Sequence, residues 1–230
     1  MRTKLIACAT VGAEIQHLIP AGMSYKFLDF GLHLTPEMLN TVVQREIDST
    51  PADVDTILLG YGMCSRGMLG LKSGRFRLIL PKVDDCIALF LGSQAEYRNQ
   101  CRKAPGTFYL TKGWIECGDD PLTEYRKLCE KYGAEKAYRI EKRYIGNYTR
   151  LALIHTDDQE CEHYRQYAAT VANHFDLTLE EIAGSVRMLE KLIEGHWDGD
   201  FVIVEPGETV RFEMFLETPQ PHTAPSPEPR

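Results

Sequence analysis

The chain lacks the short motifs by which many enzyme classes are recognised. Its 230 residues contain no CxxC, HExxH, GxGxxG or GxxxxGKS/T pattern, so zinc ribbons, zincins, dinucleotide-binding folds and P-loop enzymes have no local support. No apolar run approaches the ~20 residues that cross a bilayer, and the apolar stretch 5–9 is shorter than the core of a signal peptide. We therefore expect a soluble, cytoplasmic protein that does not contact a membrane.

Positive charge is also scarce. Lys and Arg number 26 against 33 Asp and Glu, and the resulting net charge of −7 argues against nucleic acid as a partner. The one segment rich in both basic and aromatic residues is 133–150. Such a mixture can bind nucleic acid or phosphate, but Glu135 and Glu141 interrupt it, and a solvated helix with half-packed tyrosines has the same composition. We expect that helix.

The end of the chain differs in composition from the rest. Five of the twelve prolines fall in Thr218–Arg230, which has no apolar periodicity, whereas 43% of the whole chain is hydrophobic. We therefore expect an α/β domain over residues 1–217 and a disordered, Pro-rich tail over residues 218–230.

Short apolar runs alternate with helical patterns along this domain. We expect strands at Lys4–Ala9, Lys26–Phe30, Thr56–Gly60, Arg77–Leu80, Thr107–Leu110, Leu151–His155, Leu177–Ile182 and Phe201–Val204. Helices are expected after Pro36 and at Asp85–Arg102, Pro121–Tyr132, Gln159–Phe175 and Gly184–Glu194. The alternation predicts an α/β fold whose sheet or sheets are mostly parallel, built from repeated βα units with flanking helices. The alternation of strands and helices is interrupted at 113–150. We interpret this segment as a helical insertion that allows for two subdomains.

Seven cysteines, an odd number without regular spacing, argue against a disulfide framework. Three of them follow strands: Cys8 ends the first, Cys64 follows the third and Cys86 follows the fourth. In parallel sheets, ligands bind at the carboxyl ends of the strands, where loops from several βα units meet. If those strands are neighbours, the three sulfurs face one pocket.

The loops around these cysteines suit such a pocket, because glycine lets the backbone approach a ligand closely. The residues that we expect to line it are Gly60, Tyr61, Gly62, Arg66 and Asp85. Cys86 is expected in the first turn of a helix, where unpaired N–H groups favour a thiolate, so it is the best candidate for a reactive sulfur. Asp85 is expected to cap that helix, although acidic side chains here can also bind a hard cation.

Three convergent thiolates can hold Zn²⁺ with its fourth position open, or three irons of a 4Fe–4S cluster whose fourth iron stays open. The alternative is that these cysteines fill the core, since free cysteine is often buried. Cys117 and His155 also follow strands and are candidates for an additional ligand or a neighbour of the site; His155 could equally be a general base or be hydrogen-bonded to the acidic turn after it. The cysteines expected at helical positions, buried or incidental, are Cys101, Cys129 and Cys161.

Several sequence blocks, in order, resemble a known family. They are Gly60-Tyr61-Gly62-Met63-Cys64, Asp85 to Ser93, Gly106 to Leu110 with Gly113-Trp114, and Trp197-Asp198 through Phe201 to Glu205-Pro206-Gly207. On these blocks the chain resembles DUF1638, a family of unknown function in bacteria and archaea, over residues 3–207. The resemblance implies that Cys8, Cys64 and Cys86 belong to the family's pattern. Ser65-Arg66 and Val83 stand where relatives are expected to have Gly-Asn and His, so the surroundings of the cysteines differ here.

The resemblance also implies a biochemical context. Members of the family are associated with corrinoid-dependent methyl transfer, which implies an enzyme or accessory factor in one-carbon chemistry. Its partners would be a small-molecule substrate and corrinoid or methyltransferase proteins, and its activity that of a metal- or iron–sulfur-dependent transferase or lyase. The alternative is a non-catalytic cofactor-binding or adaptor protein, which uses the same pocket or the helical surface 121–150.

Overall fold

The computed structural model describes residues 2–64, 66–118, 120–156 and 162–216. The segment expected to be a disordered tail, 218–230, lies outside the described residues, and so does Cys161. All eight expected strands are present and form two sheets, which confirms the α/β class with mostly parallel sheets. No helix in the described ranges has both the length and the apolar character needed to span a membrane.

The larger sheet has five strands in the order β2-β1-β3-β4-β8. Its first four strands are parallel to one another, and β8 is antiparallel to β4. The central strand β3 is buried at every position, as expected for a parallel strand covered on both faces. The strands are β1 (Thr3–Cys8), β2 (Ser24–Leu28), β3 (Thr56–Gly60), β4 (Arg77–Pro81) and β8 (Phe201–Val204).

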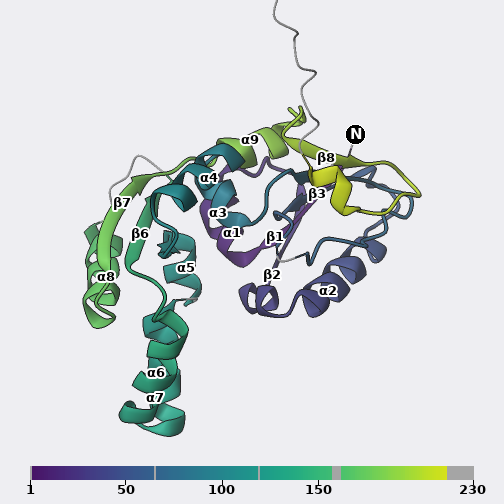
Figure 1. Cartoon of the computed structure of the whole chain (residues 1–230). Helices are drawn as coiled ribbons and strands as arrows, with labels where there is room; N and C mark the ends of the chain where they lie inside the picture. Colours follow the sequence, from purple (N-terminus) through teal and green to yellow (C-terminus); the bar gives the residue numbers. More distant parts are fainter. Residues whose placement is uncertain (1, 65, 119, 157–161, 217–230) are drawn as a thin grey trace, which may run out of the picture.

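Helices cover both faces of this sheet (Figure 1). On one face, α1 (Ala9–Ile15) contributes Val11 and Ile15 to an apolar cluster with Leu5 and Leu58. On the other face lies α2 (Pro36–Asp48), where Pro36 starts the helix as the sequence predicts. Side chains of α2 at helical spacing pack on alternate strand residues in a second cluster: Leu39, Val43 and Ile47 on Ile6, Ile57 and Leu59.

The smaller sheet has three parallel strands in the order β5-β6-β7. Between β5 and β6 the chain forms three helices, and two of them, α6 and α7, make an antiparallel hairpin that projects from the body (Figure 1). The helix expected within 133–150 is therefore confirmed as α7. These elements are β5 (Thr107–Leu110), α5 (Lys112–Cys117), α6 (Pro121–Tyr132), α7 (Ala134–Ile145), β6 (Arg150–His155), α8 (Glu162–His174) and β7 (Thr178–Ala183).

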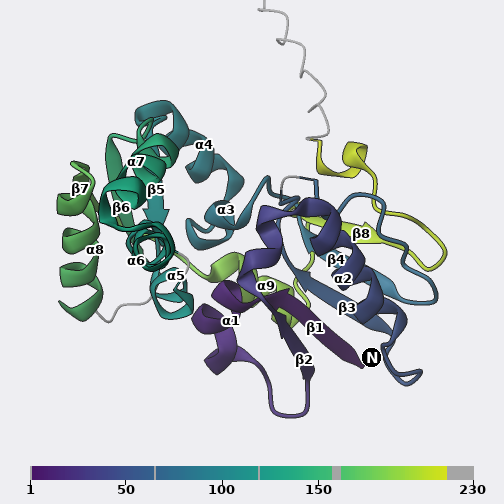
Figure 2. The same ribbon diagram turned by 90° about the horizontal axis from the view of Figure 1, so that it is seen from below.

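The two sheets share one apolar cluster. Helices α1, α5 and α9 (Arg187–Glu194) lie between them (Figure 2). The backbone N–H of Gly113 in α5 donates to the buried carboxylate of Glu14 in α1 at 2.9 Å. Gly113 is needed at this crossing, because a Cβ there would lie 2.4 Å from the carbonyl oxygen of Thr10.

One expected helix is wrong in its extent. The range Asp85–Arg102 contains two helices, α3 (Cys86–Phe90) and α4 (Gln94–Lys103). Gly92 interrupts them with a φ of +81°, and the Ser93 hydroxyl then caps α4 by accepting from the N–H of Glu96 at 3.1 Å. Three short 3-10 helices complete the described structure: η1 (Gln16–Leu18), η2 (Phe30–Leu34) and η3 (Phe212–Phe215).

Candidate functional site

The three strands that precede the candidate cysteines are neighbours, as the sequence analysis required. Strand β3 lies between β1 and β4, and all three are parallel. Cys8 is the last residue of β1, Cys64 lies in the loop after β3, and Cys86 is the first residue of α3 after β4. The three cysteines therefore belong to the same edge of the sheet. The chain reverses its winding direction between β1 and β3, which is where open α/β sheets bind their ligands.

Backbone hydrogen bonds fasten the Cys64 loop to the Cys86 loop. The N–H of Met63 donates to the carbonyl of Val83 at 2.8 Å, and the N–H of Cys64 donates to the carbonyl of Asp84 at 3.0 Å. Gly62 makes this approach possible, since a Cβ there would lie 2.8 Å from the Cα of Asp85. Two of the three cysteines thus sit on loops whose separation is fixed.

Cys64 has an unusual backbone conformation. Its φ is +46°, and Arg66 follows with a φ of +74°, in the left-handed region that non-glycine residues rarely occupy. The carbonyl of Cys64 accepts from the N–H of Gly67 at 2.9 Å, which closes a tight turn. Strain of this kind costs on the order of 1–3 kcal/mol and is concentrated at functional sites. The guanidinium of Arg66 lies 5.9 Å from the ring centre of Phe212.

Asp85 caps α3, as predicted. One carboxylate oxygen accepts from the N–H of Ile87 at 2.9 Å, and the other accepts from the hydroxyl of Tyr97 at 2.8 Å. Both oxygens are therefore engaged in positioning the start of α3, where Cys86 lies. Tyr97 was not anticipated, because nothing in the sequence links a tyrosine on α4 to the cap of α3.

The thiols influence one another electrostatically. Burial raises the pKa of Cys86 well above its usual value, and Cys64, Asp85 and Cys8 raise it further. Burial also raises the pKa of Cys64, with added contributions from Asp85 and Cys8, while a hydrogen bond from the Gly62 backbone lowers it. The expectation that the helix start makes Cys86 acidic is thus wrong for the protein without a bound group, because burial and neighbouring charges outweigh one short helix.

Two residues with hydroxyl groups, Tyr61 and Thr10, interact with Cys8. Tyr61 is 3% exposed, and its hydroxyl has no hydrogen-bond partner among the described residues. Burial raises its pKa well above the usual value, and so do the charges of Cys8, Cys64 and Cys86. The buried Thr10, which the sequence analysis did not single out, donates its hydroxyl to the Cys8 sulfur at 3.2 Å.

The three cysteines do not form a ready-made metal site, and they line neither of two surface hollows in the described structure. In the part of the chain that the structure describes, no three His, Cys, Asp or Glu side chains are arranged so that they could hold a metal ion. Two surface hollows, of about 390 and 490 Å³, contain no cysteine in their lining.

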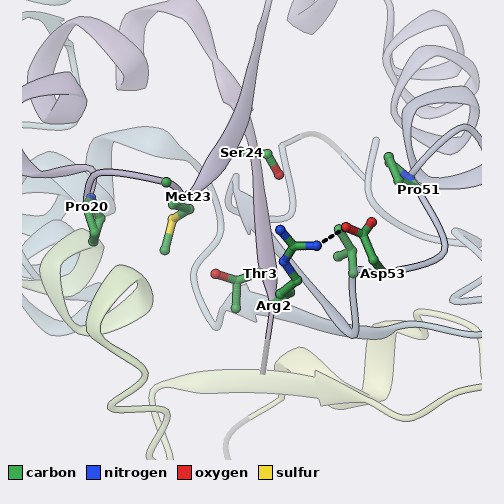
Figure 3. Close-up of a pocket in the computed structure, with 9 residues that line it drawn as sticks. Arg2, Thr3, Pro20, Met23, Ser24, Pro51 and Asp53 are labelled. Atoms are coloured by element: carbon green, nitrogen blue, oxygen red, sulfur yellow. Dashed lines mark hydrogen bonds and ion pairs between the residues drawn. The ribbon is translucent and has the colours of Figure 1, made fainter.

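The smaller hollow lies at the opposite edge of the larger sheet (Figure 3). Thr3 and Ser24, the first residues of β1 and β2, line it together with an exposed ion pair between Arg2 and Asp53. The larger hollow lies beside α9 and is lined by Arg187, Lys191 and Asp198 among others. Lys191 in this hollow is paired with both Asp198 and Asp200.

The two additional candidates belong to β6 and to α5, the helix that follows β5. His155 ends β6, and its Nε2 is 2.8 Å from a carboxylate oxygen of Glu181, which Arg165 also contacts. The acidic turn expected to bind His155, at 157–158, lies outside the described residues. Cys117 ends α5. Neither is among the groups that shift the pKa values of Cys64 and Cys86.

Of three comparisons with known proteins, only the comparison with family models finds a match. No curated protein and no solved structure matches the chain. A family model described as a protein of unknown function, DUF1638, matches residues 27–193. This range includes Cys64 and Cys86 but begins after Cys8, and it is shorter than the span 3–207 that the resemblance indicates. Because the match covers well over half of the sequence, the chain belongs to the DUF1638 family.

Proposed function

We propose that this protein binds a metal group through the thiolates of Cys8, Cys64 and Cys86. One observation carries the proposal: three cysteines follow three adjacent parallel strands at one edge of the sheet, beside Tyr61, which directly follows β3 and whose buried hydroxyl lacks a partner among the described residues. A buried donor without an acceptor is rare in folded proteins and calls for a missing ligand, ion or water. The donor set, three soft thiolates, fits zinc or iron–sulfur chemistry.

An iron–sulfur cluster is the form that we propose first. Two thiolates on one zinc ion lie only about 4 Å apart, given zinc–sulfur bonds of ~2.3 Å. A cluster binds each thiolate through a different iron and so tolerates wider separations. The described side chains include no group of three arranged for a single ion, which is why we place the cluster before zinc.

The chain's own residues would bind and orient this group. When bound, a cluster or zinc ion with three protein ligands supplies an open coordination position that acts as a Lewis acid, or as a redox centre in the cluster. Asp85 fixes the start of α3, and Gly62 lets the Cys64 loop pack against it. The thiols must release their protons on binding, because only thiolates ligate the metal.

The test is anaerobic purification followed by iron, zinc and acid-labile sulfide analysis. We expect a brown protein with visible absorption and iron and sulfide in equal amounts; stoichiometric zinc in a colourless protein would instead support the zinc form. Protein with neither metal would contradict the proposal and leave the adaptor alternative.

A role in corrinoid-dependent methyl transfer stays a prediction from the family resemblance. The described residues carry no feature that identifies a substrate, a corrinoid or a methyltransferase partner. Its test is whether the anaerobically prepared protein forms a complex with a methylated corrinoid protein, compared with the same protein after metal removal.

A further inference from the structure

The α6–α7 hairpin presents a helix face to solvent. The hairpin projects from the body of the molecule (Figure 1), and α7 buries only the stripe of Ala137, Glu141 and Ile145, each at most 2% exposed. These residues are four positions apart and therefore lie on one side of the helix. The other residues of α7 are all exposed, so its outer face is accessible to another molecule.

One flank of this outer face combines apolar and basic side chains. Ile140 and Tyr144, one turn apart, are 39% and 62% exposed. Lys136 lies one turn before Ile140, and Arg143 follows Ile140 by three residues, so all four side chains are neighbours on the helix surface. Tyrosine and arginine are enriched where proteins bind one another, and this flank has that composition.

The charge of the flank determines the charge of its partner. Glu135 is paired with Arg139 at 3.8 Å, and Glu141 is buried. Lys136 and Arg143 form no ion pair with any residue that the structure describes. A partner that covers these two cations must bring acidic groups, because a cation that loses water without gaining a counter-charge is costly.

The tyrosines of the hairpin argue against nucleic acid as that partner. Bases stack on open aromatic ring faces. The Nζ atoms of Lys131 and Lys136 lie 5.0 and 4.6 Å from the ring centre of Tyr132, and Nζ of Lys142 lies 5.4 Å from that of Tyr138. Cations therefore already lie over these rings. A membrane-bound helix, in turn, needs a continuous apolar face, whereas the apolar side of α7 is the buried one.

We propose that the outer face of α7 docks an acidic amphipathic helix of a partner protein on the flank formed by Lys136, Ile140, Arg143 and Tyr144. Helix α7 is about 18 Å long at ~1.5 Å per residue, so the partner segment needs about three turns. Its apolar side chains cover Ile140 and Tyr144, and its carboxylates pair with Lys136 and Arg143. The inference involves no residue of the cysteine site and is independent of the proposed metal group.

The test is fluorescence anisotropy of the full-length protein with a labelled synthetic peptide. The peptide has about 14 residues, with leucine at i, i+3, i+4 spacing on one side and glutamate elsewhere. We expect Lys136→Glu/Arg143→Glu and Ile140→Ser/Tyr144→Ser each to weaken binding by about 10-fold or more. Because all four side chains are exposed, the melting temperature of each variant should stay close to that of wild type.

Lys26→Glu/Arg45→Glu is the matched control. Both side chains are exposed, on β2 and α2, and the variant has the same net charge as Lys136→Glu/Arg143→Glu. We expect this control to bind the peptide with wild-type affinity, since exposed charges beyond about 8 Å are largely screened at physiological salt.

Three results would overturn the proposal. The first is wild-type protein that does not bind the peptide, or that binds it no better after the peptide's leucines are replaced by serine. The second is equal weakening in the control and the hairpin variants. The third is binding of short duplex DNA or of phosphatidylserine vesicles that depends on the hairpin, without binding of the peptide, which would assign the surface to nucleic acid or to a membrane.

Discussion

At the scale of single residues, Gly62 lets the loop that carries Cys64 pack against the segment that leads into Cys86. A Cβ at this position would lie 2.8 Å from the Cα of Asp85. We expect Gly62→Ala to push the Cys64 loop away from the start of α3, to lower the free energy of unfolding by about 1–3 kcal/mol, and to reduce metal content. Denaturant unfolding and metal analysis measure the two effects.

Gly199→Ala is the control for this change. A Cβ at Gly199 meets no atom within 4 Å, and its backbone is not in the left-handed region. Its free energy of unfolding should stay within about 0.5 kcal/mol of wild type. Equal stability of the two variants would mean that the loops are not in close contact at Gly62.

Some of this residue-level detail could be predicted from the sequence and some could not. Cys8, Cys64 and Cys86 could be placed at one sheet edge, because position after a strand is a local property and parallel strands end together. The Tyr61 hydroxyl without a partner among the described residues, and the bond from Tyr97 to Asp85, could not. They depend on which loops touch, and neither periodicity nor spacing encodes that contact.

At the scale of elements, the α6–α7 hairpin contains a buried acid. Glu141 on α7 is 2% exposed, and burial together with the charges of Glu124 and Asp120 raises its pKa to about 7. In the unfolded chain its pKa is near 4.5. Between pH 4.5 and 7, Glu141 is deprotonated in the unfolded chain but still largely protonated in the folded protein. The free energy of unfolding therefore falls as the pH rises from about 4.5 to 7.

Glu141→Gln should remove this dependence. Relative to wild type, we expect no gain in unfolding free energy at pH 4 and a gain of up to about 3 kcal/mol at pH 8. Glu135→Gln is the control, since the Glu135 side chain is 91% exposed on the same helix. Urea unfolding at both pH values is the measurement. If the gain in unfolding free energy of Glu141→Gln does not grow between pH 4 and pH 8, burial does not raise the pKa of Glu141.

The break between α3 and α4 shows why one element was misjudged. Apolar periodicity runs on through Gly92, so the sequence predicts a single helix. Gly92 ends α3 in the left-handed conformation, and a contact far along the chain holds this turn in place: the N–H of Ser185 donates to the carbonyl of Phe90 at 2.8 Å. The eight strands were easier to predict, because buried parallel strands are compact apolar runs bounded by turns.

At the scale of the whole molecule, charge is distributed unevenly. The hairpin, 121–145, has seven Lys and Arg against four Glu, within a chain of net charge −7. Its exposed tyrosines include Tyr132, Tyr138 and Tyr144. Exposed charges more than about 8 Å apart are largely screened at physiological salt, so the glutamates of the hairpin itself offset its basic residues more than distant acidic residues do.

We therefore still expect no sequence-independent binding of DNA or RNA. The dissociation constant for short duplex DNA at physiological salt should be weaker than about 10⁻⁴ M, the weak end of non-specific binding. Fluorescence anisotropy over a salt series measures it. Micromolar binding with a steep salt dependence would disprove the prediction, and its loss in Arg139→Glu/Arg143→Glu would locate the contact on the hairpin.

The central claim, that Cys8, Cys64 and Cys86 together hold one metal group, is tested most directly by the metal content of single Cys→Ser variants prepared anaerobically. A serine hydroxyl stays protonated near neutral pH and is a poor soft-metal ligand, so each of these three variants should lose most of its metal. Cys101→Ser and Cys129→Ser, on α4 and α6, should keep the wild-type amount. Metal content that is unchanged in the three variants, or equally reduced in all five, would contradict the claim.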